Sequence, residues 1–494
     1  MNILLVLHTL GTLFLLLSGI LLIPFGVSFF YGTREEMWAF IFSFIASGII
    51  GLAFKFFLKP KKEDITIREG LAIVAFWWMF CALFGALPYW FSGTCDTFCD
   101  SYFESMSGLT TTGASIFSDI EALPHGILFW RSMTQWLGGM GIVVFFVAIL
   151  PTIGVGGHKL FSAEAPDLTT DKIKPRIAQT AKILWVIYLS LTAILIPFLW
   201  FGGMEFFDAV CHSFTTVSTG GFSTKNQSIA AFDSLFIEIV IMVFAFIAGC
   251  NFILYYQLVT GKFKKVLANS EIRFFVSLML CAICLITLAL FFFDSTSYNG
   301  GVKDHKYDSV GGSLRYAAFQ AVSIMTSAGY CNADFDIWPD FCRVFLVLLM
   351  FIGGCAGSTA GGMKVARIML LCKSGVRELF HVLRPRAIMH VKLSGKPVSE
   401  NIITNTLGFI VINLGLFGVF SLILTIFGTE LITSFSSIAS MMSNVGPALA
   451  DAGATKNYSG MAYPCKWVLI FAMLIGRLEI YTVILIFLPL TWKK

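Results

Sequence analysis

The chain has 494 residues, of which 57% are hydrophobic and only 13% are charged, and its formal net charge is +5. So few charged residues cannot cover the surface of a soluble domain, which excludes a water-soluble globular protein and indicates a polytopic membrane protein. We therefore expect the lipid bilayer as its surroundings and no nucleic acid as a partner.

Ten runs of apolar residues reach the roughly 20 residues that an α-helix needs to cross a bilayer. They predict an all-α polytopic membrane protein with ten transmembrane helices. The first run is long and lacks the basic start and small-residue cleavage site of a signal peptide, so we expect it to be retained. The predicted spans are Ile3–Phe30, Met37–Leu58, Leu71–Phe91, Ile127–Leu150, Ile183–Phe201, Leu235–Leu258, Phe274–Phe293, Phe341–Leu371 (interrupted), Ile402–Phe427 and Trp467–Leu488.

Basic residues are shared unequally between the two sides of these predicted helices. The loops on one side carry 24 Lys and Arg residues, whereas the other side carries nine. Because basic loops tend to stay in the cytoplasm, both termini are predicted to be cytoplasmic. Acidic residues show the opposite bias, with 19 on the outer side, and such a surface concentrates cations at an outer mouth.

A small, hydroxyl-rich turn occurs four times along the chain. Aligned on Gly113, Gly220, Gly329 and Gly446, the turns lie 107, 109 and 117 residues apart. Each turn follows a short amphipathic segment that cannot cross a bilayer, so each segment must enter the membrane and return on the same side. The predicted short helices cover residues 100–109, 207–216, 315–325 and 432–442.

The repeat divides the chain into an N-terminal transmembrane hairpin and four pseudo-repeats of span, pore loop and span around one pore. Irregular backbone at membrane depth is stable only where protein buries it or where it lines a water-filled cavity. Four pore loops around one axis satisfy that condition together. The hairpin is assigned to residues 1–62 and the four pore units to 63–176, 177–268, 269–392 and 393–494, the third with a broken second span.

The tips of the four turns predict a ring of backbone carbonyl groups. The short helices would point their negative ends at the centre, and glycine permits the positive φ that aims carbonyls at a common axis. Such a ring replaces the hydration shell of a monovalent cation, whereas divalent sites commonly recruit carboxylates, which the turns lack. A single turn of this kind is more often a glycine cap of a helix, but four at near-equal spacing favour an ion filter. The predicted filter residues are Thr111, Thr112, Gly113, Ser218, Thr219, Gly220, Ser327, Ala328, Gly329, Asn444, Val445 and Gly446.

A glycine-rich stretch, residues 353–362, interrupts the second span of the third unit. Five glycines in ten residues destabilise a helix by roughly 1 kcal/mol each, so the span is predicted to break there and to form a gate beside the ion path. The alternative is close helix packing through pairs of small residues. A nucleotide-binding loop is excluded, because Met363 stands where that motif requires Lys. The predicted gate residues are Gly353, Gly354, Gly357, Ser358, Thr359, Gly361 and Gly362, together with Arg477.

Arg477 and Glu479 place two charges inside the last apolar span. Charges within a membrane face the protein interior or a water-filled cavity. We interpret Arg477 as an electrostatic barrier beneath the filter; the alternative is a salt bridge to another span.

No arrangement typical of an enzyme is found. The seven histidines are dispersed, and no H-E-x-x-H or complete G-x-S-x-G motif occurs. The twelve cysteines lack metal-like spacing. A polytopic membrane enzyme is the alternative from another class, but it would leave the fourfold repeat unexplained.

The four span, pore loop, span units, the filter glycines, the broken span and Arg477 together resemble the superfamily of potassium transporters that includes bacterial Trk and Ktr and plant HKT proteins. The N-terminal hairpin is most similar to the TrkH/TrkG type of membrane subunit. The resemblance implies K⁺ as the transported ion, no covalently bound cofactor and uptake across a bacterial inner membrane. Glycine at all four filter positions is similar to the K⁺-permeable members of this superfamily. Whether the flow is a gated channel or is coupled to H⁺ or Na⁺ as symport stays open.

The resemblance also implies partners. It predicts a homodimer with a pore in each protomer and a TrkA-type cytoplasmic ring, through which a nucleotide, NAD(H) or ATP/ADP, would regulate transport. The basic segment Arg377–Lys396 is a candidate docking surface for that ring, and ordinary cytoplasmic loop charge is an equally good interpretation of it.

Overall fold

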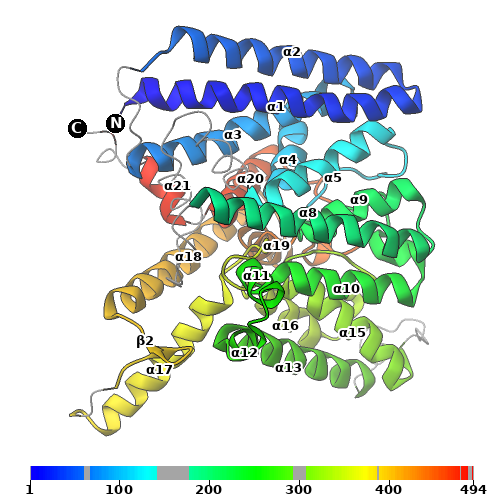
Figure 1. The fold of residues 1–494 in the computed structure, drawn as a ribbon. Helices are drawn as coiled ribbons and strands as arrows, with labels where there is room; N and C mark the ends of the chain where they lie inside the picture. The colour runs from blue at the N-terminus through cyan, green and yellow to red at the C-terminus, as the bar shows by residue number, and fades with distance from the viewer. Residues whose placement is uncertain are drawn as a thin grey trace.

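The structure is a computed structural model that describes residues 2–60, 67–141, 177–292, 307–386, 389–478, 480–487 and 492. These residues are predominantly α-helical, as the sequence predicts (Figure 1). The exceptions are loops, a two-stranded antiparallel hairpin and short 3-10 helices. The hairpin pairs β1 (Lys392–Leu393) with β2 (Lys396–Pro397). The 3-10 helices are η1 (Ser228–Phe232), η3 (Phe335–Ile337) and η4 (Ala450–Ala452).

The N-terminal hairpin consists of α1 (Ile3–Tyr31) and α2 (Arg34–Phe57), which lie side by side (Figure 1). Gly32 ends α1 with a φ of 76°, a left-handed conformation that glycine adopts without strain. A Cβ on Gly11 would lie 2.8 Å from the backbone nitrogen of Lys55 and 2.9 Å from the carbonyl oxygen of Gly51. The two helices therefore approach closely through small residues, as is common in membranes.

The remainder of the described chain contains four units of the same helix order. Each unit has a long first helix, a short helix and a second helix. The first helices are α3 (Ile67–Phe91), α8 (Ile177–Phe201), α13 (Ser270–Phe292) and α18 (Glu400–Ile426). The short helices are α4 (Phe98–Leu109), α9 (Phe206–Val217), α15 (Val310–Met325) and α19 (Leu431–Ser443), which confirms the four predicted short segments. The second helices are α5 (His125–Gly139), α10 (Leu235–Gly249), α16 (Asp340–Met350) and α20 (Tyr463–Leu478).

The four units pack into a closed ring. Each second helix contacts the short helix of its own unit and the short helix of the next unit, in the order α4, α5, α9, α10, α15, α16, α19, α20 and back to α4. Each first helix packs against the short helix of its own unit, and α1 and α2 pack on α3 and α5 outside the ring. The short helices thus lie innermost, and α4 is buried from Ser101 to Leu109. The fold confirms the prediction of four pseudo-repeats with a separate hairpin.

Six helices in the described ranges are long and apolar enough to cross a membrane, namely α1, α2, α3, α8, α13 and α18. They are the hairpin and the first helix of every unit. Among the described residues the second helix of each unit is shorter than the span predicted there, so the predicted count of ten transmembrane helices is not confirmed. Residues 142–176, which come after α5, and Glu479 between α20 and α21 (Ile480–Phe487) lie outside the described residues.

Within the described ranges, the second spans of the second and third units are interrupted. In the third unit α16 and α17 (Val365–Leu383) are separated by the glycine-rich stretch, as predicted. In the second unit α10 and α11 (Phe252–Val259) are bent by 96°, with α12 (Phe263–Leu267) beyond them. The prediction of one continuous span over residues 235–258 is therefore wrong.

The bend after α10 is stabilised by contacts that sequence alone does not show. Asn251 caps α11 by accepting a hydrogen bond from the backbone N–H of Ile253 at 2.9 Å. The backbone N–H groups of Cys355 and Thr359 donate to the terminal carbonyls of α10, at Gly249 (2.9 Å) and Ala248 (3.3 Å). The glycine-rich stretch therefore satisfies polar groups that a broken helix would otherwise leave unpaired inside the membrane.

Candidate functional site

The four turns at the centre of the ring share one backbone conformation. Each short helix is followed by a residue with positive φ: Thr111 (52°), Thr219 (55°), Ser327 (53°) and Asn444 (53°). Two residues later each turn has a glycine with positive φ: Gly113 (80°), Gly221 (79°), Gly329 (71°) and Gly446 (103°). Left-handed residues at alternate positions keep the N–H groups on one side of the backbone and the carbonyl groups on the other.

Equivalent hydrogen bonds hold the four turns. In the first, the N–H of Thr111 donates to Gly108 (3.0 Å) and that of Thr112 donates to Ser107 (2.9 Å). The same two bonds recur in the other turns, from Thr219, Gly220, Ser327, Ala328, Asn444 and Val445. This is the pattern of a helix end that closes on a left-handed residue, a position where glycine is usual. A side chain there costs roughly 1 to 2 kcal/mol, so the surrounding contacts must hold the four strained residues in place.

The structure changes the register of the second turn. Its glycine equivalent to Gly113 is Gly221, whereas the sequence alignment used Gly220, and Thr219 rather than Ser218 is the left-handed residue. Gly220 instead occupies the position of Thr112. Two adjacent glycines made the alignment ambiguous, but the spacing contained the signal, because Gly113, Gly221 and Gly329 lie 108 residues apart in both intervals.

Each of these glycines lies against a carbonyl group of the next turn. A Cβ on Gly113 would come within 3.0 Å of the carbonyl oxygen of Gly220, a separation that real side chains essentially never show. The same is true of a Cβ on Gly221 against Ala328, on Gly329 against Val445, and on Gly446 against Thr112. The contacts run from the first turn to the second, third, fourth and back to the first. The four turns therefore form a closed ring with the carbonyls of Thr112, Gly220, Ala328 and Val445 at equivalent places.

The glycine-rich loop, defined as residues 353–362, packs directly against this ring. Its two ends meet where Gly353 donates to the carbonyl of Met363 at 2.9 Å. The N–H of Gly361 donates to the hydroxyl of Ser327 at 2.7 Å, and a Cβ on Gly361 would overlap Asn444. The hydroxyl of Thr359 lies 3.4 Å from that of Thr219. The loop thus contacts the left-handed residues of the second, third and fourth turns.

The remaining predicted gate residues lie in the same loop. Gly357 and Gly362 have positive φ, of 72° and 70°. A Cβ on Gly354 would lie 2.6 Å from the carbonyl oxygen of Gly249, and the hydroxyl of Ser358 donates to Cys355 at 2.6 Å. These glycines are required by close backbone contact and by turn geometry, so the loop is tightly packed in this state.

Arg477 on α20 links the loop to the first unit. Its guanidinium donates to the carbonyl of Thr359 at 2.8 Å and to those of Gly138 and Gly139 at the end of α5. A cation is favourable beside the carbonyl end of a helix. The structure therefore places Arg477 in contact with the predicted gate loop, while its companion Glu479 lies outside the described residues.

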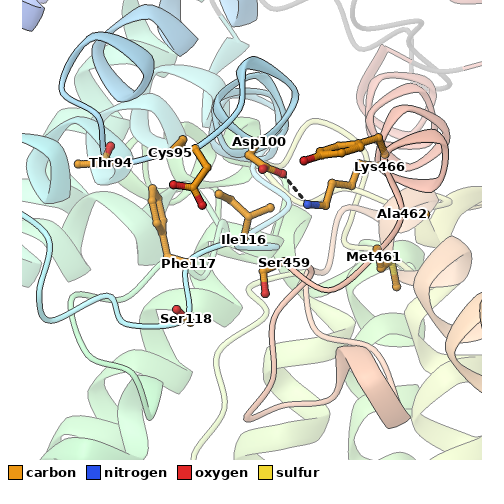
Figure 2. A pocket seen from close by; sticks show the side chains of 12 residues that line it. Thr94, Cys95, Asp100, Ile116, Phe117, Ser118, Ser459, Met461, Ala462 and Lys466 are labelled. Atoms are coloured by element: carbon orange, nitrogen blue, oxygen red, sulfur yellow. Dashed lines mark hydrogen bonds and ion pairs between the residues drawn. The ribbon is translucent and has the colours of Figure 1, made fainter.

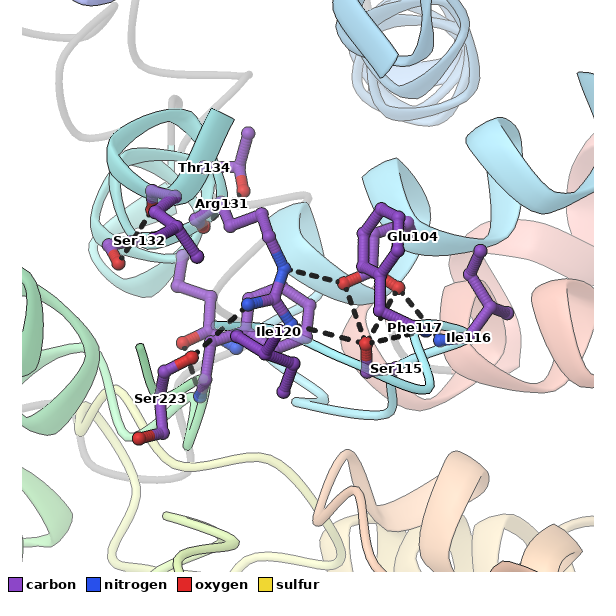
Figure 3. Close-up of polar contacts among 12 residues, drawn as sticks. Glu104, Ser115, Ile116, Phe117, Ile120, Arg131, Ser132, Thr134 and Ser223 are labelled. Carbon is purple, nitrogen blue, oxygen red and sulfur yellow. Dashed lines mark hydrogen bonds and ion pairs between the residues drawn. The ribbon is translucent and has the colours of Figure 1, made fainter. Parts of the chain in front are cut away.

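A buried ion pair supports the ring from behind, and sequence reasoning missed it. Arg131 on α5 and Glu104 on α4 are 1% and 0% exposed, and their Nε and Oε1 atoms lie 2.8 Å apart. Glu104 also accepts from the N–H of Ile116 (3.0 Å), while Arg131 donates to the carbonyl of Ser223 (3.2 Å) (Figure 3). The pair therefore joins the segments that leave the first and second turns. The sequence signal that could have indicated this pair is the presence of Arg131 and Glu104 within segments predicted to lie in the membrane.

A cavity of about 440 Å³ lies beside the ring between the first and fourth units. Figure 2 shows the ion pair that lines it, with Lys466 Nζ 2.6 Å from Asp100 Oδ1. Burial raises the pKa of the nearby Cys95 thiol to about 12, so this thiol is protonated at neutral pH. Lys466 and Asp100 neutralise each other in this wall, and Asp96 is a further carboxylate that lines the cavity.

Known proteins resemble this chain over its full length. The family TrkH, described as cation transport protein, matches residues 37–493. The Trk system potassium uptake protein TrkH of Salmonella typhimurium is 40% identical over 487 residues, which cover 98% of each chain. The Trk system potassium uptake protein TrkG of Escherichia coli is 33% identical over 99% of this chain and 98% of its own. The crystal structure of the potassium transporter TrkH from Vibrio parahaemolyticus superposes with a TM-score of 0.86 at 36% identity, over 100% of both chains.

The buried ion pair is expected to be essential for stability. Glu104→Gln leaves the Arg131 charge buried without its carboxylate and should lower the free energy of unfolding by about 3 to 5 kcal/mol. The matched control is Asp451→Asn, which breaks the exposed pair between Asp451 and Lys456 (3.9 Å) and should cost no more than about 1 kcal/mol. Thermal unfolding of the two purified variants in detergent measures the difference, and equal stabilities would contradict it.

Proposed function

The chain belongs to the TrkH family of cation transport proteins, and on that premise we propose that it takes up K⁺ through a pore at the centre of the four-unit ring. Its relatives are named as potassium transporters, which are membrane transporters and not enzymes. The multi-pass helical fold agrees with this class.

The cyclic packing of the four turns is the observation that carries the proposal. The carbonyls of Thr112, Gly220, Ala328 and Val445 occupy equivalent places in a closed ring. Carbonyl groups around an axis can replace the hydration shell of K⁺. The four turns contain no carboxylate, so the ring suits a monovalent ion better than a divalent one. We assign ion selection to this ring, with Gly221 added to the predicted filter residues.

We assign gating to the glycine-rich loop and Arg477. The loop contacts three of the four turns, and Arg477 holds it to the end of α5. A K⁺ ion passing about 7 Å from the guanidinium would meet roughly 2 kcal/mol of repulsion at an effective dielectric constant of 20. Movement of the loop together with Arg477 would remove both the obstruction and the charge.

The proposed assembly is a homodimer in a bacterial inner membrane, with cytoplasmic termini and a TrkA-type ring that brings NAD(H) or ATP/ADP. The names of the relatives place them in a Trk system, which supports a partner subunit. A surface for contacts with another subunit is present on α17, which projects from the ring (Figure 1). This helix exposes the apolar side chains Leu379 (69%), Val382 (79%) and Leu383 (75%). Apolar side chains so exposed suit a protein interface.

The first prediction from the proposed function concerns coupling. If flow through the ring is passive, the reversal potential of the purified protein in a planar bilayer should follow the K⁺ gradient and stay constant when pH changes on one side. The measurement is a series of K⁺ gradients at fixed and at unequal pH. A pH-dependent shift away from the K⁺ equilibrium potential would indicate H⁺ symport on the same fold, and a Na⁺-dependent shift would indicate Na⁺ symport.

The second prediction concerns the ring. Gly113→Ser should raise the permeability of Na⁺ relative to K⁺, because the new Cβ must displace the carbonyl of Gly220 from its place. The control is Gly93→Ser, a glycine that also has positive φ (70°) but has nothing within 4 Å of its Cβ position. Reversal potentials under K⁺/Na⁺ gradients report the ratio. An unchanged ratio in Gly113→Ser would remove Gly113 from the filter.

The third prediction concerns the loop. Deletion of residues 354–361 should raise basal K⁺ flux into liposomes in the absence of any partner subunit. The deletion is sterically feasible, because the Cα of Gly362 lies 3.1 Å from the Cβ position of Gly353. Size-exclusion chromatography first establishes that the variant is folded. Folded protein with unchanged flux would contradict a gate, and loss of folded protein would support helix packing as the role of the loop.

A further inference from the structure

Gln135 on α5 contacts the ring directly. Its side chain is fully buried, with 0% exposure. The side-chain Nε2 donates a hydrogen bond to the carbonyl oxygen of Gly220 at 2.7 Å, and Oε1 accepts one from the backbone N–H of Phe222 at 3.0 Å. Both backbone groups belong to the second turn, whereas Gln135 belongs to the first unit. It reaches across because α5 packs between α4 and α9.

The orientation of the Gln135 amide is set by its partners. A carbonyl oxygen can only accept a hydrogen bond, and a backbone N–H can only donate one. The NH₂ group must therefore face Gly220 and the oxygen must face Phe222. The same side chain satisfies two backbone groups of one turn, on either side of Gly221, and so fixes the two peptide planes that adjoin this glycine.

Gln135 also occupies a space that is filled differently in the other three turns. The position equivalent to Gly220 is Thr112 in the first turn, Ala328 in the third and Val445 in the fourth. Gly220 alone has no side chain. A Cβ placed on it would overlap the Gln135 amide, whose three terminal atoms are its nearest neighbours. The side chain of Gln135 thus takes the place that a residue of the turn itself occupies elsewhere.

We propose that Gln135 is a positioning residue for ion selectivity, because it holds the Gly220 carbonyl at its place in the ring. This inference rests on the proposed function of the ring. The Gly220–Gly221 sequence has two residues of unusual backbone freedom, so its peptide rotates more easily than those of the other turns. A carbonyl oxygen has two lone pairs, so Gly220 can accept from Gln135 and still face an ion.

The loss of this bond has a defined consequence for selectivity. With Gln135 in place, all four carbonyls are fixed at the separation that suits K⁺. Without Gln135, the Gly220 carbonyl can move toward a smaller ion or rotate away from the axis. Discrimination against Na⁺ should then fall, whereas the fold of α5 itself is unaffected because the bond is made by the side chain.

Gln135→Leu is the principal test, because leucine keeps most of the volume and removes both hydrogen bonds. We expect the Na⁺/K⁺ permeability ratio to rise by about two- to tenfold, the range that corresponds to the loss of the one hydrogen bond that holds the Gly220 carbonyl. The matched control is Ser132→Ala, also buried on α5, whose hydroxyl bonds Leu128 of its own helix at 3.1 Å. This control should keep the wild-type ratio.

A double variant separates hydrogen bonding from space filling. Gly220→Ala alone should reduce total flux, because its Cβ overlaps Gln135. Gln135→Ala with Gly220→Ala should recover flux, since the third turn already has alanine at this position, but the ratio should stay raised because the bonds are absent. Recovery of the wild-type ratio together with flux would show that Gln135 only fills space and would overturn the proposal.

The Gly113→Ser variant distinguishes failure of this inference from failure of the proposed pore. If Gly113→Ser changes the ratio and folded Gln135→Leu does not, the ring selects ions without Gln135 and the inference is wrong. If neither variant changes the ratio, the placement of the filter fails and the inference fails with it. If Gln135→Leu does not fold, the ratio of the double variant decides the question in the same way.

Discussion

The structure depends on one constraint, which is that backbone polar groups inside a membrane must find partners. The short helix of each of the four units cannot cross a bilayer, and each is followed by irregular backbone. One such turn alone would leave its carbonyls without partners in lipid. The ring resolves this, because each turn lies against the next and all four share one central axis. A dehydrated cation needs oxygen ligands in place of its hydration water, and the backbone carbonyls of the four turns can supply them.

The four turns share some features and differ in others, and the two sets of features suit different roles. All four share the strained left-handed residue and the glycine two positions later, and these features suit ion selection. The second, third and fourth turns contact the glycine-rich loop. In the first turn the hydroxyl of Thr111 is buried and has no hydrogen-bond partner among the described residues. The first turn is instead supported by the ion pair of Glu104 and Arg131.

The sequence predicted the architecture well because hydropathy and turn chemistry are local signals. The short helices, the hairpin and the broken third unit are indicated by residues that lie close together in the chain. Gln135 bonds residues 85 and 87 positions away, and Arg131 bonds Glu104 27 positions away. Such contacts arise only when helices pack, so no local pattern indicates them. The break after α10 was missed for the same reason, since its carbonyls are satisfied by a loop about 100 residues further on.

That last contact couples the glycine-rich loop, the proposed gate, to the second unit. Cys355 and Thr359 donate to the open end of α10, and Phe252 at the start of α11 donates to Gly357. Withdrawal of the loop would leave the carbonyls of Ala248 and Gly249 without these donors. Inside a dry membrane that would cost several kcal/mol, but beside a water-filled pore water can replace the lost donors. Opening of the loop and hydration of the break after α10 are therefore expected to occur together. The interrupted second spans of the second and third units would then move as one unit.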